Sequence, residues 1–296
     1  MKINLNKDEE FIQMIPGDYI LDNETVVDNP LGMSANKLTA NIHAVIAKTN
    51  TLTNLANSIK KAGFGIIDIF MSPSLAGQVV LAEEEKKIGV VLIDIGEDTS
   101  DIIIYKNSKV VFSCVLPIGG ALISHSIAEK MMLSLDKAED IKIHYGYAGD
   151  KMPGIEEELS VAHLSGSGKG FRKVLTKDIS KIIDQKLNKI FEQFDDIIKK
   201  SNYKDELFAG IVFTGGSSLL RGFISQAKKY FSCPVRMGSI SFNIKNKNYK
   251  GPQYSTIAGI GSVIESNNIK KLNCMPDIKL MHIYLEKFKD FFKELF

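Results

Sequence analysis

Residues 94 to 101, DIGEDTSD, carry side chains that suit the binding of phosphate and a divalent cation. Backbone amides in such a tight turn can point inward and cradle a phosphate, and Gly96 allows close approach of a ligand. Thr99 and Ser100 can donate hydroxyl hydrogen bonds, and Asp94, at the end of an apolar run, can hold a magnesium-bound water. In isolation, however, the segment is better explained as an ordinary hairpin tip with a glycine.

Two later segments place paired glycines between an apolar run and a predicted helix start. In TGGSSLLRG, residues 214 to 222, Gly215 and Gly216 would let the sugar or base of a nucleotide lie against the backbone. The helix that follows would present free amides and the positive end of its dipole. PIGG, residues 117 to 120, has the same arrangement. For each pair, a turn in which glycine serves only packing explains the residues about as well.

Composition narrows the classes of protein that could carry these loops. With 296 residues, 44% of them hydrophobic and 24% charged, the chain can bury a substantial core and form two units. A net charge of +2 implies no general affinity for nucleic acid. The three cysteines, Cys114, Cys233 and Cys274, have no CxxC spacing, the histidines are dispersed, and no HExxH occurs. Disulfide scaffolds, zinc hydrolases and triad enzymes are therefore not indicated.

Hydrophobic periodicity predicts a first unit made of strand, strand, helix, strand and helix. Residues 10–22 and 36–48 alternate apolar and polar residues, which predicts a small antiparallel sheet. Residues 50–63 have apolar residues at helical spacing and end at Gly63, a suitable C-cap. The unit is completed by a strand over residues 66–72 and a helix to about Glu85.

Three β-branched runs joined by tight turns predict an antiparallel meander with the acidic loop at its first turn. These runs are residues 89–95, 101–106 and 109–116. The first and third are apolar nearly throughout, which predicts burial on both faces. The remaining predicted elements are helices over residues 119–133, 136–146, 177–201, 220–231 and 252–266 and a buried strand over residues 208–214.

Residues 151–175 are predicted to be irregular, with SGSGKGF at 165–171 as a solvated loop. This loop is not interpreted as a phosphate-binding Walker loop, because it lacks the Gly-Lys-Ser/Thr ending and the helix start that must follow it.

The last segment, LMHIYLEKFKDFFKELF, follows a predicted linker over residues 267–279 and predicts an amphipathic helix over 280–296. One face is apolar and aromatic: Leu280, Met281, Tyr284, Leu285, Phe288, Phe291, Phe292 and Leu295. The opposite face carries three lysines balanced by three acidic residues, so attraction to anionic lipid would be modest. Such a helix could lie at a bilayer interface, or it could dock on the body or on a partner.

The order of these motifs resembles that of the actin, Hsp70 and sugar-kinase superfamily, and most closely its bacterial cell-division branch, the FtsA family. A DxGxxTSD hairpin, a PIGG turn, an AEDIKIHYG segment and a TGGSSLLRG turn follow one another with that family's spacing. MIPGDYILDN, NPLGMSANKL and IHAVIA resemble the small subdomain peculiar to FtsA, and PQYSTIAGI resembles the family's Pro-x-Tyr-Ser-Thr segment. The resemblance covers nearly all of residues 10–265.

The resemblance implies an α/β, actin-like ATPase fold of the ribonuclease H-like type that lacks most of subdomain 1A. It divides the chain into an FtsA-type α+β subdomain 1C (SHS2-like), an actin-like domain 2 (2A/2B), a linker and a membrane-targeting amphipathic helix. Their predicted bounds are 1–85, 86–266, 267–279 and 280–296.

The resemblance also implies bound ATP or ADP with magnesium, and nine residues match the family's nucleotide motifs. They are Asp94, Gly96, Thr99 and Ser100 in the second phosphate loop, Glu139 and Lys142 on the helix near ribose and base, and Gly215, Gly216 and Ser217 in the adenosine motif. Asp94 would reach magnesium through water. No catalytic residue is implied, because nucleotide in this family mainly controls shape and polymer assembly, with weak or no hydrolysis.

As partners, the resemblance implies the tubulin-like division protein FtsZ, further copies of the chain in actin-like filaments, later division proteins and membrane lipid. The chain would tether FtsZ to the cytoplasmic face of the cell membrane at the division site. Arg221, Lys228 and Lys229 could contact acidic groups of the FtsZ tail, although an ordinary solvated face explains them nearly as well.

Two departures from the family pattern lower the expected affinity for nucleotide. Glu97 and Asp98 stand where the family has small residues, and each adds negative charge beside the phosphates. The chain also starts after the family's first phosphate hairpin, so half of the cleft would be absent and helix 253–266 would expose an apolar face. The alternatives are a degenerate or split actin-like protein that acts only as a scaffold, a small-molecule kinase and a pilus-assembly adaptor.

Overall fold

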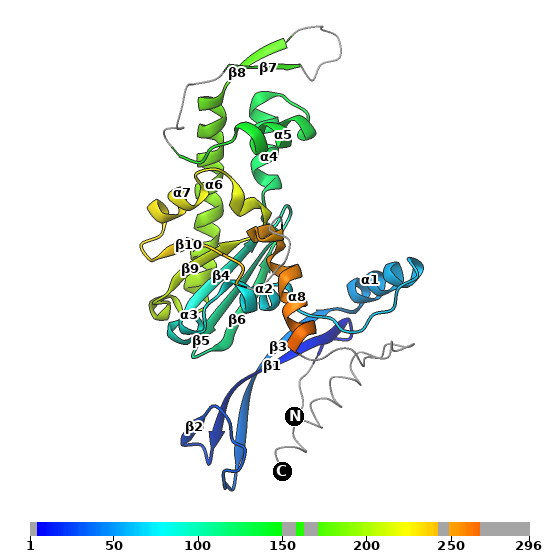
Figure 1. Ribbon diagram of the computed structural model, residues 1–296, viewed down its shortest axis with the longest axis vertical. Coiled ribbons are helices and arrows are strands. Elements are labelled where there is room, and N and C mark those ends of the chain that lie inside the picture. The colour runs from blue at the N-terminus through cyan, green and yellow to red at the C-terminus, as the bar shows by residue number, and fades with distance from the viewer. Residues whose placement is uncertain (1–4, 150–157, 163–170, 242–248, 267–296) are drawn as a thin grey trace.

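A computed structural model describes residues 5–149, 158–162, 171–241 and 249–266 of the chain. Its long axis runs from a small three-stranded sheet at one end, through a larger five-stranded sheet, to a helical region with a two-stranded hairpin at the other end (Figure 1).

The small sheet has the strand order β2-β1-β3. Its strands are β1 (Glu9–Leu21), β2 (Thr25–Val27) and β3 (Leu38–Lys48), and helix α1 (Thr49–Lys61) follows directly. β1 and β3 pair antiparallel along nearly their whole length, as the alternation of apolar and polar residues predicts. Gly63 has φ +84°, so a residue without Cβ leads the chain out of α1. The strands predicted over residues 10–22 and 36–48 and the helix predicted over residues 50–63 are confirmed.

The strand predicted over residues 66–72 is wrong, because residues 64–71 have no regular structure. Within the described part of the chain, no strand pairs with this segment, and the Met71 amide donates instead to the Gln13 side chain. The helix predicted to continue to about Glu85 is two helices, α2 (Ser72–Val80) and α3 (Glu83–Ile88), separated by Leu81 in an extended conformation.

The five-stranded sheet has the order β10-β9-β4-β5-β6. Its strands are β4 (Val90–Ile95), β5 (Ser100–Lys106), β6 (Lys109–Leu116), β9 (Gly210–Thr214) and β10 (Val235–Met237). β4, β5 and β6 form the predicted antiparallel meander, whereas β4 pairs parallel with β9, more than a hundred residues later in the chain. One prediction about burial is wrong: β5 is mostly buried, and β6 is a partly exposed edge strand.

Helices cover the two faces of this sheet unequally. Helices α6 (Thr176–Lys200) and α7 (Phe223–Tyr230) lie on one face, and α4 (Ala121–Met131) and α5 (Leu135–Tyr145) lie beyond the strand ends beside α6 (Figure 1). Apolar side chains of all four helices share one core with β4, β5 and β9. On the other face, α2 packs against α8 (Ser255–Ser266) and forms a second, smaller core. The predicted helices in these regions are confirmed, although α7 starts at Phe223, after a 3-10 turn over Gly216–Leu219.

The stretch predicted to be irregular, residues 151–175, contains an antiparallel hairpin of β7 (Glu158–Ala162) and β8 (Phe171–Leu175). Most of the SGSGKGF loop falls outside the described residues, as do the predicted linker 267–279 and the predicted helix 280–296. None of the helices within the described ranges is long and apolar enough to cross a membrane.

Candidate functional site

Three turns meet above the ends of β4 and β9, and all three are the glycine-containing segments singled out from the sequence. The carbonyl of Gly96 accepts hydrogen bonds from the Gly120 amide, at 3.0 Å, and from the Ser217 hydroxyl, at 2.7 Å. The Ala121 amide donates to the carbonyl of Glu97 at 2.8 Å. The acidic turn is therefore joined directly to the PIGG turn and to the turn after β9.

Glycine is required where the PIGG turn meets its neighbours. A Cβ on Gly119 would lie 2.1 Å from the carbonyl oxygen of Glu97, and a Cβ on Gly120 would lie 2.2 Å from the Ser217 hydroxyl. Neither separation is possible for real atoms. The structure thus supports the packing explanation for this glycine pair, since it lets the three turns approach closely.

A cavity of about 630 Å³ opens beside the joined turns. Its polar wall comes from the turns and α5, and its apolar wall from α4, α5 and the turn before α7. The lining residues are Gly96, Glu97, Gly120, Ile123, Glu139, Lys142, Ile143, Gly216, Ser217, Leu219, Leu220 and Gln253. A concave site with an apolar wall and a few convergent polar groups is the usual form of a small-molecule site.

The structure brings five of the nine predicted nucleotide residues to this cavity, namely Gly96, Glu139, Lys142, Gly216 and Ser217. Asp94 and Gly215 lie just behind it and touch each other, because a Cβ on Gly215 would lie 2.4 Å from Asp94 Oδ1. Thr99 closes the acidic turn through its backbone carbonyl, which accepts from the Gly96 amide. Ser100 is fully buried, and its hydroxyl donates to the Ile118 carbonyl, so the structure does not bring it to the cavity.

Glu139 and Lys142 form an ion pair one helical turn apart on α5, with Lys142 Nζ 2.7 Å from Glu139 Oε2. Lys142 also donates to the Gly120 carbonyl at 3.2 Å, and the Ser124 hydroxyl donates to Glu139. Burial alone would raise the pKa of Glu139, but the hydrogen bonds from Lys142 and Ser124 leave that pKa below its usual value. The cavity wall therefore presents a fixed, ionised pair.

Two carboxylates face each other behind the acidic turn, where Asp94 on β4 pairs with Asp101 on β5. Burial raises the pKa of Asp94, which accepts a hydrogen bond from the Thr256 hydroxyl at 3.3 Å. Burial and the charge of Asp94 together raise the pKa of Asp101 to about 6. The described residues contain no group of three or more His, Cys, Asp or Glu side chains that could hold a metal ion.

Several residues of the site were not predicted from the sequence. Of the apolar wall, Ile123 and Ile143 lie in segments that were predicted simply as helices, and Leu219 and Leu220 lie in the TGGSSLLRG turn, where only Gly215, Gly216 and Ser217 were given a role. Gln253 lies in the PQYSTIAGI segment, which was quoted for its resemblance and not for a role in the site. Glu97, which was expected to disfavour phosphate, does line the cavity.

Comparison with known proteins decides the family. A family model described as "Cell division protein FtsA" matches residues 91–259, which include all the turns of the site. A second, described as "SHS2 domain inserted in FTSA", matches residues 1–46. The chain belongs to the FtsA family.

Curated relatives agree with this assignment. The FtsA of Neisseria meningitidis serogroup B is 34% identical over 265 residues, which are 87% of this chain and 62% of the relative. The FtsA of Pseudomonas aeruginosa is 31% identical over 86% of this chain and 60% of the relative. The chain thus spans about 60% of the length of these FtsA proteins.

Solved structures show that the fold is actin-like. Spiroplasma citri MreB5 bound to ADP is similar with a TM-score of 0.62 and 18% identity, over 76% of this chain and 68% of that protein. A PilM–PilN type IV pilus biogenesis complex gives a TM-score of 0.64 and 15% identity, over 88% and 68%. The predicted actin-like fold class is confirmed.

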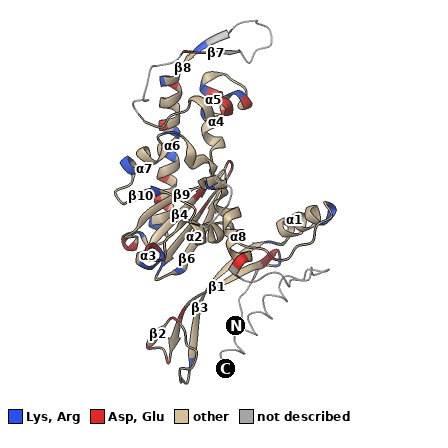
Figure 2. Cartoon of the chain, viewed as in Figure 1, with Lys and Arg blue, Asp and Glu red and all other residues tan. Residues whose placement is uncertain are grey.

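The basic residues expected to contact FtsZ differ in their structural surroundings. The Arg221 guanidinium donates to the carbonyls of His144, at 2.7 Å, and Gly146, at 3.1 Å, and so caps the end of α5. Lys228 and Lys229 lie in the last turn of α7, where Figure 2 shows a cluster of basic residues. The predicted membrane residues, Met281, Tyr284, Leu285, Phe288, Phe291, Phe292 and Leu295, lie outside the described residues.

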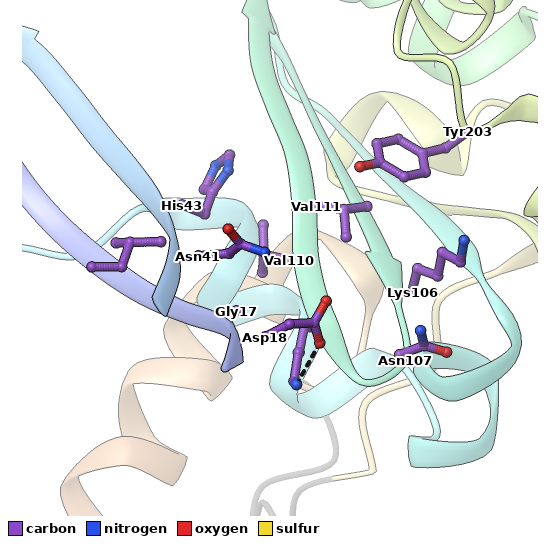
Figure 3. A pocket seen from close by; sticks show the side chains of 11 residues that line it. Gly17, Asp18, Asn41, His43, Lys106, Asn107, Val110, Val111 and Tyr203 are labelled. Atoms are coloured by element: carbon purple, nitrogen blue, oxygen red, sulfur yellow. Dashed lines mark hydrogen bonds and ion pairs between the residues drawn. The ribbon is translucent and has the colours of Figure 1, made fainter. Parts of the chain in front are cut away.

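A second cavity, of about 300 Å³, lies where the small sheet meets the β5–β6 hairpin. Asp18, Asn41 and His43 border it from β1 and β3, and Lys106 and Tyr203 border it from across β6 (Figure 3). This region is a joint between the two sheets.

The charged side chains at this joint are paired with each other. A β-bulge between Pro16 and Tyr19 places Asp18 2.7 Å from Lys109 Nζ, and Lys109 also pairs with Asp28 at 2.7 Å. Lys106 pairs with Glu206. The two pairs of Lys109 connect the small sheet to the β5–β6 hairpin, whereas the Lys106–Glu206 pair joins β5 to the turn after α6.

Proposed function

We propose that this FtsA-family chain is a cell-division adaptor that binds adenine nucleotide in the 630 Å³ cavity and links FtsZ polymers to the membrane through residues 280–296. The observation that carries the proposal is the convergence of the acidic, PIGG and TGGSSLLRG turns on one cavity, within the segment that matches the FtsA family.

In this proposal the chain's own residues divide the recognition of nucleotide between the two walls of the cavity. Gly96, Gly216 and Ser217 would lie against the phosphates and sugar, and Glu139 with Lys142 would contact the ribose. The apolar wall would hold the base. Asp94 would hold magnesium through water, and the magnesium would offset the phosphate charge.

The position of the turns also supports the alternative of a scaffold that binds no nucleotide. The amides of Gly120 and Ala121 are already used by the carbonyls of Gly96 and Glu97, so they would not be available to a phosphate. The Glu97 side chain adds a negative charge to the wall. Hydrolysis would be weak or absent in either case.

Calorimetric titration with Mg-ATP distinguishes the two proposals, with Gly216→Asp as the decisive variant. A Cβ on Gly216 would meet only Gln253, at 4.0 Å, so the variant should fold while it adds a negative charge to the cavity. We expect the parent to bind, Gly216→Ala to bind comparably, and Gly216→Asp to bind at least about tenfold more weakly. A parent that gives no heat with Mg-ATP would leave the scaffold as the function.

The acidic turn allows a converse test of the same cavity. Glu97→Gly with Asp98→Gly should tighten binding of Mg-ATP, because two negative charges leave the vicinity of the phosphates. If affinity does not change, the charge of this turn does not limit binding.

Vesicle flotation tests the adaptor role. The full chain should carry FtsZ upward with vesicles, and Phe288→Glu with Phe292→Glu should leave both proteins behind, because two charges on the apolar face oppose insertion. Lys287→Ala with Lys293→Ala is the matched control on the polar face and should still float. A chain that floats while FtsZ stays behind would refute the link to FtsZ but not the membrane role.

Further partners follow from the same proposal. Lys228 and Lys229 would contact acidic groups of FtsZ, with Arg221 contributing less because it caps α5. The small sheet would contact neighbouring copies in a filament and later division proteins. Together these contacts would place the chain on the inner face of the membrane at the division site.

A further inference from the structure

Helix α8 presents a row of isoleucines to solvent on the face turned away from α2. Ile257, Ile260 and Ile264 are 68%, 41% and 51% exposed and follow one another at spacings of three and four residues. On the opposite side of the same helix, Ala258 and Val263 are buried. We call Ile257, Ile260 and Ile264 the α8 row.

The orientation of α8 is fixed by its contacts, so the α8 row always faces away from α2. Gly259 fixes how α8 lies on α2, since a Cβ at this position would come within 2.2 Å of the Leu75 carbonyl oxygen. The Thr256 hydroxyl, which donates to Asp94, anchors the beginning of the helix on the sheet. Because α8 cannot rotate about its axis, the three isoleucines of the α8 row can be buried only if another segment packs on them.

Residues 280–296 are the segment of this chain that fits the row. Their apolar residues recur at three and four, the spacing that lets one helical face pack along another. The 13 residues 267–279 that separate them from α8 span up to roughly 45 Å when extended, and α8 itself is about 18 Å long. The segment can therefore reach every part of the row from the end of the helix that carries it.

We propose that residues 280–296 dock on the α8 row when no membrane is present, so that the row and the bilayer compete for one apolar face. The inference rests on the membrane role proposed above and adds a regulation to it. Because residues 280–296 are covalently linked to α8, their effective concentration near the α8 row is high, and docking can occur even if its intrinsic affinity is low. Docking lowers the apparent affinity for vesicles, because the intrinsic affinity is multiplied by the fraction of chains that are undocked.

The chain contains no tryptophan, so Phe288→Trp supplies a single reporter on the apolar face of the segment. The reporter is combined with Ile260→Asn, which places a neutral polar group in the middle of the row. Leu55→Asn is the matched control, because Leu55 is an exposed apolar residue of another helix, α1, at 53% exposure. Ile257→Asn repeats the test at a second position of the row.

Without lipid, we expect the reporter in the otherwise unchanged chain to emit at short wavelength and to resist acrylamide. Ile260→Asn and Ile257→Asn should shift emission to the red and raise the quenching constant about twofold or more, while Leu55→Asn changes neither. A reporter that is already accessible, or that Ile260→Asn and Leu55→Asn affect alike, overturns the proposal. Protection that is lost on dilution would assign the row to a second copy and would also overturn it.

Vesicles of phosphatidylcholine and phosphatidylglycerol complete the test. Ile260→Asn should bind them several-fold more tightly than the parent, because no docked state competes. Equal vesicle affinities in the two chains would contradict the competition. If the reporter responds to Ile260→Asn without lipid but neither chain binds vesicles, docking stands and the membrane role fails.

Discussion

The two faces of the five-stranded sheet are built differently. On one face, β4, β5 and β9 pack against four helices in a single large core that includes an aromatic cluster of Phe191, Phe194, Phe213 and Phe223. On the other face, α2 and α8 are the main cover among the described residues, and the core there is smaller. This second face also bears the Asp94–Asp101 pair and the exposed α8 row.

This difference indicates that most of the stabilising apolar packing lies on the first face, whereas the second face carries buried charge. Leu92 and Ile103 continue along their strands into Asp94 and Asp101 on the same face, so an apolar core gives way to charge within two residues. Buried carboxylates with raised pKa values destabilise a fold and are frequent at functional sites. The fully covered face therefore holds the sheet together, and the open face is available for partners.

The largest effect should come from Phe191→Ala on the covered face. Phe191 is fully buried, and its ring lies 5.4 Å from the rings of both Phe223 and Phe231. Removing it should lower the free energy of unfolding by about 3–5 kcal/mol, measured by urea denaturation. The corresponding change on the open face, Leu75→Ala, should cost less, about 2–3 kcal/mol. An equal or larger loss at Leu75 would contradict the comparison.

An intermediate, pH-dependent effect should come from Asp101→Asn on the open face. The pKa of Asp101 in the native chain is about 6, above the ordinary value of 3.8, so between these values the native chain holds a proton that the unfolded chain has released. Stability contributed by this group is present at low pH and is lost as the pH rises through about 6. The variant should therefore be more stable than the parent at pH 7, and the advantage should shrink toward about pH 4.

Melting temperatures of parent and Asp101→Asn across this pH range check the prediction. Asp205→Asn, at an exposed position, serves as the control for removing a surface carboxylate. If the difference in melting temperature between Asp101→Asn and the parent does not change with pH, the pKa of Asp101 is not raised in the native state.

The smallest effect should come from Ile257→Ala in the α8 row. This side chain is 68% exposed, so the free energy of unfolding should change by less than about 0.5 kcal/mol. Val263→Ala, on the buried side of the same helix, should cost about 1–2 kcal/mol. Chemical denaturation of the two variants tests whether only the buried side of α8 stabilises the fold. Similar decreases in the free energy of unfolding for both variants would contradict this.

Much of the fold could be predicted from the sequence, because its signals are local. Alternation over residues 10–22 and 36–48 identified β1 and β3 to within one or two residues, and apolar spacing identified α6 to within a residue. The motif order also led to the FtsA family. The failure at residues 66–72 is equally physical, since a β-like run forms a strand only when another strand is placed beside it.

The candidate site could be predicted in part. The glycine turns and the Glu139–Lys142 pair were found from motif residues, and the structure brings them to one cavity. Ser100 and Arg221 were assigned to ligands, but their side chains satisfy backbone carbonyls of Ile118, His144 and Gly146. Sequence spacing does not reveal which carbonyls a polar side chain will meet, because these partners lie up to 77 residues away.

The sequence by itself determined the periodicity of most elements, the chemistry of the three turns and the family of this chain. Those properties depend on neighbours along the chain or on motif order. Only the tertiary structure decided that β4 lies between β5 and β9, that β6 forms the edge of the sheet, that Asp94 and Asp101 lie on the face that α8 covers, and that four helices share a core with the other face. These properties depend on contacts between distant segments, and burial and pKa follow from those contacts rather than from residue type.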